Sequence, residues 1–244
     1  MAVKSIQYMQ HTFDISYEIL NPEAKVDLIV LHGWGSSKAI MKNVFSPFMD
    51  SFRHIYIDLP GFGNSTCPIA LKTSDVTRIV ELLMIHLNAG KDIILGHSFG
   101  GKVALLLEPK VLVLVASAGI YIPKPLSVQF KIATTKVFNF LGLKKFRSLF
   151  IAQDAKNLSK PMYETFKNVV DEDFTQEFST YQGKALLCWG EQDTATPLSS
   201  AHNIKELIKD SKLQVYKGDH FFFTKVAQDI AVRTEETFLA TVSH

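Results

Sequence analysis

A serine set between glycines is the clearest candidate for a nucleophile in this chain. The apolar segment 92–96 runs into Gly96-His97-Ser98-Phe99-Gly100-Gly101, after which a helical pattern begins. A G-x-S-x-G sequence between a strand and a helix predicts a sharp turn that exposes the serine hydroxyl beyond the strand end. The free N–H groups at the start of the helix favour an oxyanion at that place. We therefore expect Ser98 to act as a nucleophile.

A serine hydroxyl needs a base, which is usually a histidine held by a carboxylate. His220 follows the last apolar strand, and Asp193 follows the strand before it. Open α/β sheets place functional groups in loops at the carboxyl ends of strands. Glu191 and Asp219 are the competing carboxylates, but Asp219 is adjacent to His220 and so is poorly placed to hold its ring. The chain order Ser98, Asp193, His220 predicts a nucleophile, an orienting acid and a base.

A second glycine-containing turn is expected to supply an oxyanion hole. The apolar segment 28–31 leads into His32-Gly33-Trp34-Gly35. The backbone N–H of Trp34, together with that of Phe99, would stabilise an oxyanion formed beside Ser98. The His32 side chain is expected to brace this loop. A further glycine-rich turn at 58–65 is a weak signal alone, and no Gly-Lys-Ser/Thr follows it to indicate phosphate binding.

The elements that must position these residues read as a mostly parallel α/β sheet. Short apolar segments rich in β-branched residues predict buried strands, at 26–31, 54–58, 92–96, 110–117, 185–190 and 213–217. Helical spacing falls between them, at 37–51, 74–88, 99–108, 199–209 and 225–242. Thr73 and Ser74 are expected to cap the second helix. Alternation at 6–19 predicts a strand pair that adds an antiparallel edge, and strands alternating with helices predict right-handed crossovers.

One stretch interrupts this alternation and is expected to form a helical lid. Residues 122–181 contain amphipathic helical patterns and no convincing buried strand, so the predicted core comprises 1–121 and 182–244. The first half of the insert is basic and the second half is acidic. The basic half is read first as a solvated helix face, with attraction of an anionic substrate group or partner as the alternative.

Composition excludes several other classes of protein. The chain has 244 residues and a formal net charge of +2, which gives no whole-protein field of the kind that nucleic-acid binders show. Its longest nearly uncharged apolar run, 111–122, is shorter than the roughly 20 residues of a membrane-spanning helix. Cys67 and Cys188 are too far apart in sequence to suggest a metal-spaced pair or a disulfide framework. We expect a cytoplasmic protein without metal or cofactor.

Taken together, the motifs resemble the α/β-hydrolase superfamily across the whole chain. They are His32-Gly33-Trp34-Gly35, Asp58-Leu59-Pro60-Gly61-Phe62-Gly63, Gly96-His97-Ser98-Phe99-Gly100-Gly101, Gly190-Glu191-Gln192-Asp193 and Gly218-Asp219-His220. The resemblance implies acyl-enzyme chemistry in which Ser98 attacks, His220 transfers the proton and Asp193 fixes its tautomer. One departure is the short helix after Ser98, because Glu108-Pro109-Lys110 leads at once into the next strand.

Two branches of this superfamily look most similar, and both act on small molecules. One is the small carboxylesterases, including the pimeloyl-ester esterase of biotin synthesis. The other cleaves a carbon–carbon bond in 2-hydroxy-6-oxo-dienoates, usually with an aromatic residue after the catalytic histidine and an arginine in the lid. Here these positions hold Phe221 and Arg147. Ester hydrolysis is favoured, cleavage of a keto-acid is the alternative, and a noncatalytic ligand receptor is a third possibility. Gly33, His97, Phe221 and Arg147 are expected to line the substrate site.

Overall fold

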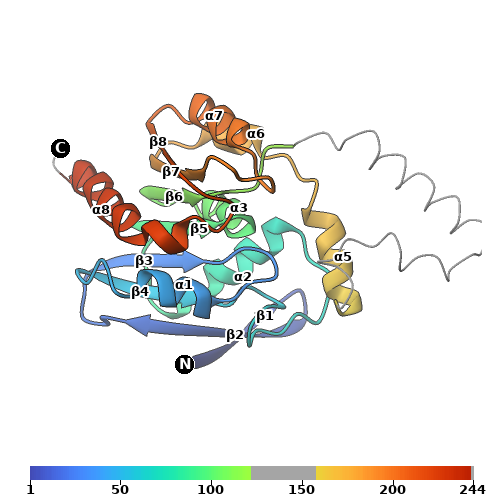
Figure 1. Ribbon diagram of the computed structural model, residues 1–244. Helices are drawn as coiled ribbons and strands as arrows, with labels where there is room; N and C mark the ends of the chain where they lie inside the picture. The colour runs from blue at the N-terminus through green and yellow to red at the C-terminus, as the bar shows by residue number, and fades with distance from the viewer. Residues whose placement is uncertain (122–157, 243–244) are drawn as a thin grey trace, which may run out of the picture.

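The fold is built on one sheet whose strands are mostly parallel (Figure 1). The computed structural model describes residues 1–121 and 158–242. Within them eight strands follow the order β1-β2-β4-β3-β5-β6-β7-β8. The strands are β1 (Ala2–Tyr8), β2 (His11–Leu20), β3 (Val26–Leu31), β4 (Phe52–Ile57), β5 (Ile93–His97), β6 (Val111–Val115), β7 (Lys184–Gly190) and β8 (Ser211–Tyr216). Pairing is parallel from β4 to β8, while β1 and β2 add the predicted antiparallel edge. The α/β fold class is therefore confirmed.

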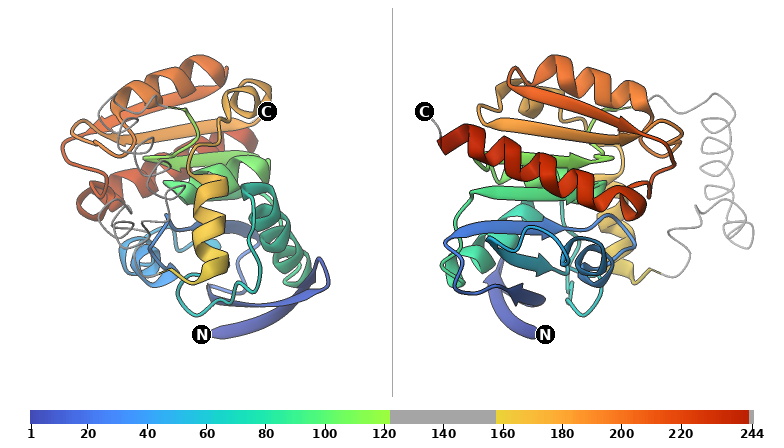
Figure 2. Two further views of the ribbon diagram at one scale, coloured as in Figure 1. Left: turned by 90° about the vertical axis from the view of Figure 1, so that its right-hand side faces the viewer. Right: turned by 60° about the vertical axis from the view of Figure 1, so that its left-hand side comes forward.

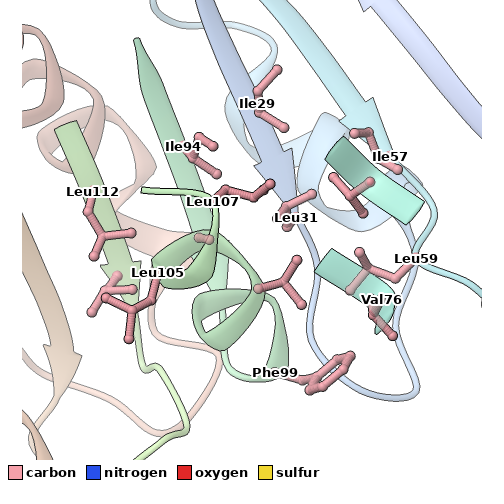
Figure 3. Packing of buried hydrophobic residues seen from close by; sticks show 14 of the residues in the cluster. Ile29, Leu31, Ile57, Leu59, Val76, Ile94, Phe99, Leu105, Leu107 and Leu112 are labelled. Atoms are coloured by element: carbon pink, nitrogen blue, oxygen red, sulfur yellow. The ribbon is translucent and has the colours of Figure 1, made fainter. Parts of the chain in front are cut away.

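The central strands are apolar throughout because helices cover both faces of the sheet. Every residue of β5 and β6 is buried. Along β3 the side chains alternate, so that Ile29 and Leu31 join the core on one face and Leu28 and Val30 the core on the other. Figure 3 shows the first of these cores, where strand residues meet side chains from the helices, among them Val76, Phe99 and Leu105.

The helices form one layer on each face of the sheet (Figure 2). α1 (Lys38–Phe45) and α8 (Phe223–Val242) lie on the same face, where the rings of Phe45 and Phe223 stack 6.1 Å apart. The other face is covered by α2 (Thr73–His86), α3 (Phe99–Leu106) and α7 (Leu198–Leu207), whose buried apolar side chains belong to the core of Figure 3. No helix in the described ranges is both long enough and apolar enough to cross a membrane.

Two helix boundaries follow from local backbone chemistry. α1 ends at Phe45 instead of continuing to residue 51, because Pro47 has no N–H with which to continue the helical hydrogen bonds and Met49 adopts a φ of 64°. α3 ends at Leu106, and Glu108 with a φ of 51° then turns the chain into β6. The short helix after Ser98 is thus confirmed, since α3 has 8 residues and begins directly after the serine.

The predicted cap of α2 is wrong. The helix already includes Thr73, and Lys72 occupies the cap position. The Lys72 N–H donates to Asp75 Oδ2 at 2.8 Å, so a carboxylate in the first turn satisfies this end of the helix. The Thr73 hydroxyl donates instead to Glu172, which lies 99 residues away in the sequence. A tertiary partner has therefore replaced the local cap.

The described part of the predicted lid packs against the core. It contains α5 (Lys160–Val169) and α6 (Thr175–Thr180), and Met162 and Phe178 join the core of Figure 3. Lys102 of α3 is buried beneath it, where its ammonium donates to the Val169 carbonyl oxygen and lies 3.2 Å from Glu172 Oε2. Residues 122–157 lie outside the described residues, so the lid boundaries at 122 and 181 stay a prediction.

Candidate active site

Ser98 occupies a strained turn between β5 and α3. Its φ of 51° and ψ of −115° are unfavourable for a residue with a side chain, at a cost of about 1–3 kcal/mol. Three backbone hydrogen bonds hold the turn: the Ser98 N–H donates to Val115, and the Ser98 carbonyl accepts from Gly101 and Ala118. A Cβ on Gly100 would lie 2.6 Å from the carbonyl oxygen of His32. Only glycine there allows the nucleophile turn and the loop after β3 to approach this closely.

His220 and Asp193 meet in the loops that follow β8 and β7. His220 Nδ1 lies 2.8 Å from Asp193 Oδ2. The other carboxylate oxygen, Oδ1, accepts from the backbone N–H groups of Ala195 at 2.8 Å and Thr196 at 2.9 Å. These bonds lock the rotation of the carboxylate, so the same oxygen always faces the imidazole. With Asp193 ionised, Nδ1 carries the proton, which leaves Nε2 free to act as a base.

The charge on Asp193 is maintained despite its burial. Burial alone would raise the pKa of this carboxyl group, but hydrogen bonds from His220 and Thr196 outweigh it and hold the pKa below its ordinary value. The carboxylate is therefore ionised at neutral pH and available to stabilise a positive imidazolium.

Thr196 is a residue of this site that the sequence reasoning missed. Its hydroxyl lies 2.8 Å from Asp193 Oδ2 and 3.4 Å from His220 Nδ1, so it contacts both members of the pair. A partial signal was present in the sequence, since an aspartate at a strand end commonly accepts the N–H groups two and three residues later in an Asx-turn. The second contact of the threonine depends on folding, which brings it to the His220 loop.

His97, the residue before Ser98, contacts His220 and so places the nucleophile turn next to the His220–Asp193 pair. The His97 ring lies 4.7 Å from the His220 ring, and its Nε2 is 3.2 Å from the His220 carbonyl oxygen. In the described residues Ser98 and His220 make no direct hydrogen bond. Catalytic hydrogen bonds are often long in unliganded sites and shorten when substrate binds, so this geometry is compatible with proton transfer.

The loop after β3 lies directly against the nucleophile turn. A Cβ on Gly33 would be 3.0 Å from Ser98 Cβ and 2.8 Å from His97 Nδ1. His32 braces the loop as predicted, because its Nδ1 lies 2.7 Å from the Gly33 carbonyl oxygen and its Nε2 accepts from the Leu59 N–H at 3.0 Å. Trp34 and Phe99, the two expected oxyanion-hole residues, are side by side, with ring centroids 5.6 Å apart.

Aromatic rings form one wall beside this loop. The Trp34 ring packs edge-on against Phe62 and Phe99, and Phe166 of α5 lies 5.3 Å from it. Phe62 and Phe99 are buried, whereas Trp34 and Phe166 are partly exposed. α5 therefore contributes an apolar surface next to the candidate oxyanion hole.

The residues expected to line the substrate site differ in their surroundings. Gly33 faces Ser98, and Phe221 is 49% exposed with its ring 5.5 Å from that of His220. His97 is buried, and its contact with His220 gives it a supporting position behind the pair. Arg147 lies outside the described residues. Of the competing carboxylates, Glu191 is exposed, and Asp219 accepts from the Phe221 N–H.

Two buried histidines near Ser98 are expected to make the protein sensitive to acid. Burial lowers the pKa of His32 to about 4 and that of His97 to about 3, so both are neutral in the folded chain. Because the unfolded chain binds protons below about pH 6.5, stability is full above that pH and is lost as the pH falls toward the folded values. We expect each histidine to remove about 2 kcal/mol from the free energy of unfolding between pH 7 and pH 5.

Urea unfolding at several pH values measures this loss. His97→Gln keeps a donor for the His220 carbonyl but cannot take up a proton, so its free energy of unfolding should fall less steeply between pH 7 and pH 5. His202→Gln, on the exposed surface of α7, is the control and should follow the wild type. Parallel curves for wild type and His97→Gln would contradict the assignment.

Comparisons with known proteins identify the family to which the chain belongs. A family model described as "Alpha/beta hydrolase family" matches residues 28–233. A pimeloyl-[acyl-carrier protein] methyl ester esterase of Vibrio vulnificus is 25% identical over 244 residues, covering 87% of this chain and 91% of that protein. One from Wigglesworthia glossinidia brevipalpis is 25% identical over 217 residues, covering 75% of this chain and 80% of that protein.

Solved structures share the fold along nearly the whole chain. An esterase from Exiguobacterium antarcticum superposes with a TM-score of 0.73 at 21% identity, covering 98% of this chain and 99% of that one. A meta-cleavage product hydrolase from Pseudomonas fluorescens IP01 gives 0.72 at 20% identity, with 98% of each chain covered. With the family match spanning most of the sequence, the chain belongs to the alpha/beta hydrolase family and is an α/β-fold hydrolase.

Proposed function

We propose that this hydrolase cleaves a small carboxylic ester through an acyl-enzyme, with Ser98 as nucleophile, His220 as base and Asp193 as the acid that orients it. The observation that carries the proposal is the 2.8 Å contact between His220 Nδ1 and Asp193 Oδ2 beside the strained turn of Ser98. The two esterase relatives described above support an ester as the substrate class.

The reaction proceeds in two steps, acylation and deacylation of Ser98. His220 Nε2 takes the hydroxyl proton while Ser98 Oγ bonds to the ester carbonyl carbon, and the carbonyl oxygen becomes an oxyanion. The N–H groups of Trp34 and Phe99 stabilise that oxyanion. The imidazolium then gives its proton to the departing alkoxide as the bond between it and the carbonyl carbon breaks. The alcohol is released, and the acyl group remains on Ser98. In the second step water attacks the acyl carbon while His220 takes its proton. His220 then returns the proton to Ser98 Oγ, and the carboxylic acid and free Ser98 are released.

The substrate site is proposed to lie between the core and the predicted lid. Trp34 and Phe166 supply an apolar wall there, which suits an alkyl acyl or alcohol group better than a charged one. Gly33 leaves room for the reacting carbonyl beside Ser98, and half-exposed Phe221 borders His220. No group of three or more metal-binding side chains occurs in the described ranges.

A substrate panel tests the proposal directly. p-Nitrophenyl esters from acetate to dodecanoate should be hydrolysed, and a 2-hydroxy-6-oxo-dienoate should be turned over with a much lower kcat/KM. A dienoate preferred over every ester would replace ester hydrolysis by carbon–carbon cleavage. A folded wild type that neither hydrolyses esters nor reacts with a fluorophosphonate probe would instead support a noncatalytic ligand receptor.

A further inference from the structure

A buried lysine connects the loop beside Ser98 to the end of β4. Lys38, the first residue of α1, is 3% exposed, and its ammonium lies 2.6 Å from Asp58 Oδ2. The ammonium also donates to Ser16 Oγ at 2.8 Å. None of these three residues belongs to the proposed catalytic set. A buried ion pair is costly to desolvate, so a buried ammonium that contacts both a carboxylate and a hydroxyl needs a reason for being retained.

The Asp58 carboxylate also accepts hydrogen bonds from two backbone N–H groups. Its Oδ1 accepts the first N–H of α1, from Lys38 itself, at 2.8 Å. Its Oδ2 accepts the Asn64 N–H at 3.0 Å. An anion at the start of a helix is favourable, and α1 has no hydrogen bond from a Ser37 side-chain cap. Asp58 therefore fixes where α1 begins, and Lys38 neutralises and holds the carboxylate that does so.

The position of α1 matters because the loop 32–37 ends there. At its other end, His32 Nε2 accepts the N–H of Leu59. The loop is thus attached at both ends to two consecutive residues, Asp58 and Leu59, that follow β4. Between these attachments lie Gly33, which abuts Ser98, and Trp34, whose N–H is the proposed oxyanion donor.

We infer that Lys38 is a positioning residue for the oxyanion hole: through Asp58 it fixes the distal end of the loop 32–37 and so sets the distance from the Trp34 N–H to the reacting carbonyl. The inference rests on the proposed function and extends it to a residue outside the motifs. The buried ion pair between Lys38 and Asp58 would thus be retained because it positions the oxyanion donor. A loop held at one end only would leave the donor misplaced when the oxyanion forms.

Lys38→Met removes the ammonium while keeping an unbranched side chain that is one atom shorter. Losing one oxyanion donor costs about 10²- to 10³-fold in kcat, so a displaced donor should lower kcat by about 10- to 100-fold. KM should change by less than about twofold, because the ground-state ester does not depend on that hydrogen bond. The Ki of a trifluoromethyl ketone, which forms an oxyanion on Ser98, should rise by the same factor as kcat falls. The Ki of the corresponding alcohol should stay constant.

Lys42→Met is the matched control. Lys42 lies one turn further along α1 and pairs with Glu18 of β2, so this variant also removes an ion pair between helix and sheet. It has no contact with Asp58 and should keep wild-type kcat and Ki values. Circular dichroism at the assay temperature establishes that each variant is folded.

Each outcome decides the inference. A folded Lys38→Met enzyme with kcat within twofold of wild type overturns it, and so does an equal weakening of the ketone and the alcohol, which would indicate a generally loosened site. If Lys38→Met does not fold, Ser16→Ala decides, since it removes one hydrogen bond of the ammonium without leaving a charge unpaired. A threefold to tenfold decrease in kcat, with an equal increase in the ketone Ki and no change in KM or in the alcohol Ki, supports the inference. An unchanged kcat and ketone Ki overturn it. An inert wild type overturns the proposed function itself.

Discussion

Ser98→Ala is expected to abolish fluorophosphonate labelling and to lower kcat for an ester by about 10⁴- to 10⁶-fold. The side chain carries the only atom that bonds to the acyl group in the proposed mechanism, and no neighbouring group replaces it. The remaining turnover would come from the oxyanion hole and substrate binding alone. Alanine tolerates the backbone of the turn as well as serine does, so the variant should fold with nearly unchanged stability.

Labelling followed by intact-mass measurement and by mass spectrometry of the digested protein distinguishes the outcomes. Wild type should gain one probe adduct on the peptide that contains Ser98, and Ser98→Ala should gain none. Ser117→Ala is a suitable control, because Ser117 is also buried near α3 but its hydroxyl donates to the Ala118 carbonyl and has no part in the mechanism. Retained labelling in Ser98→Ala would place the nucleophile elsewhere.

Asp193→Asn should be nearly as damaging, with kcat lowered by about 10⁴-fold. Asp193 Oδ1 accepts two backbone N–H groups, from Ala195 and Thr196, so an asparagine must keep its carbonyl oxygen at that position. Its amide NH₂ is then directed at His220 Nδ1. The imidazole must present a lone pair there and carry its proton on Nε2, where it faces Ser98 and cannot accept the hydroxyl proton.

Nitrogen NMR of the imidazole reports this tautomer change independently of activity. Asp193→Asn should move the protonated position of His220 from Nδ1 to Nε2 while KM changes little. Asp219→Asn and Glu191→Gln test the competing carboxylates and should keep kcat within a few-fold of wild type. A larger loss of kcat in either of them than in Asp193→Asn would assign the orienting acid differently.

The buried strands and the order of the motifs were readable from the sequence. The segment 26–31 was predicted and is observed as Val26–Leu31, because a strand covered on both faces needs an unbroken apolar run. The edge hairpin followed from alternation at 6–19. Helix ends were less predictable: Thr73 looked like a cap, yet its hydroxyl contacts Glu172 from the acidic half of the predicted lid. A tertiary contact of this kind leaves no periodic signal.

The sequence by itself determined the class of fold and the chemical types at its strand ends: a serine in a glycine turn, an aspartate, a histidine and a His-Gly loop. Strand and turn formation depend on local side-chain patterns, so they can be recognised along the chain. Only the tertiary structure decided that Asp193 Oδ2 faces His220, that Thr196 contacts both, and that Lys38 meets Asp58 and Ser16. These contacts join residues from different strands and loops, and their geometry arises from sheet order and packing.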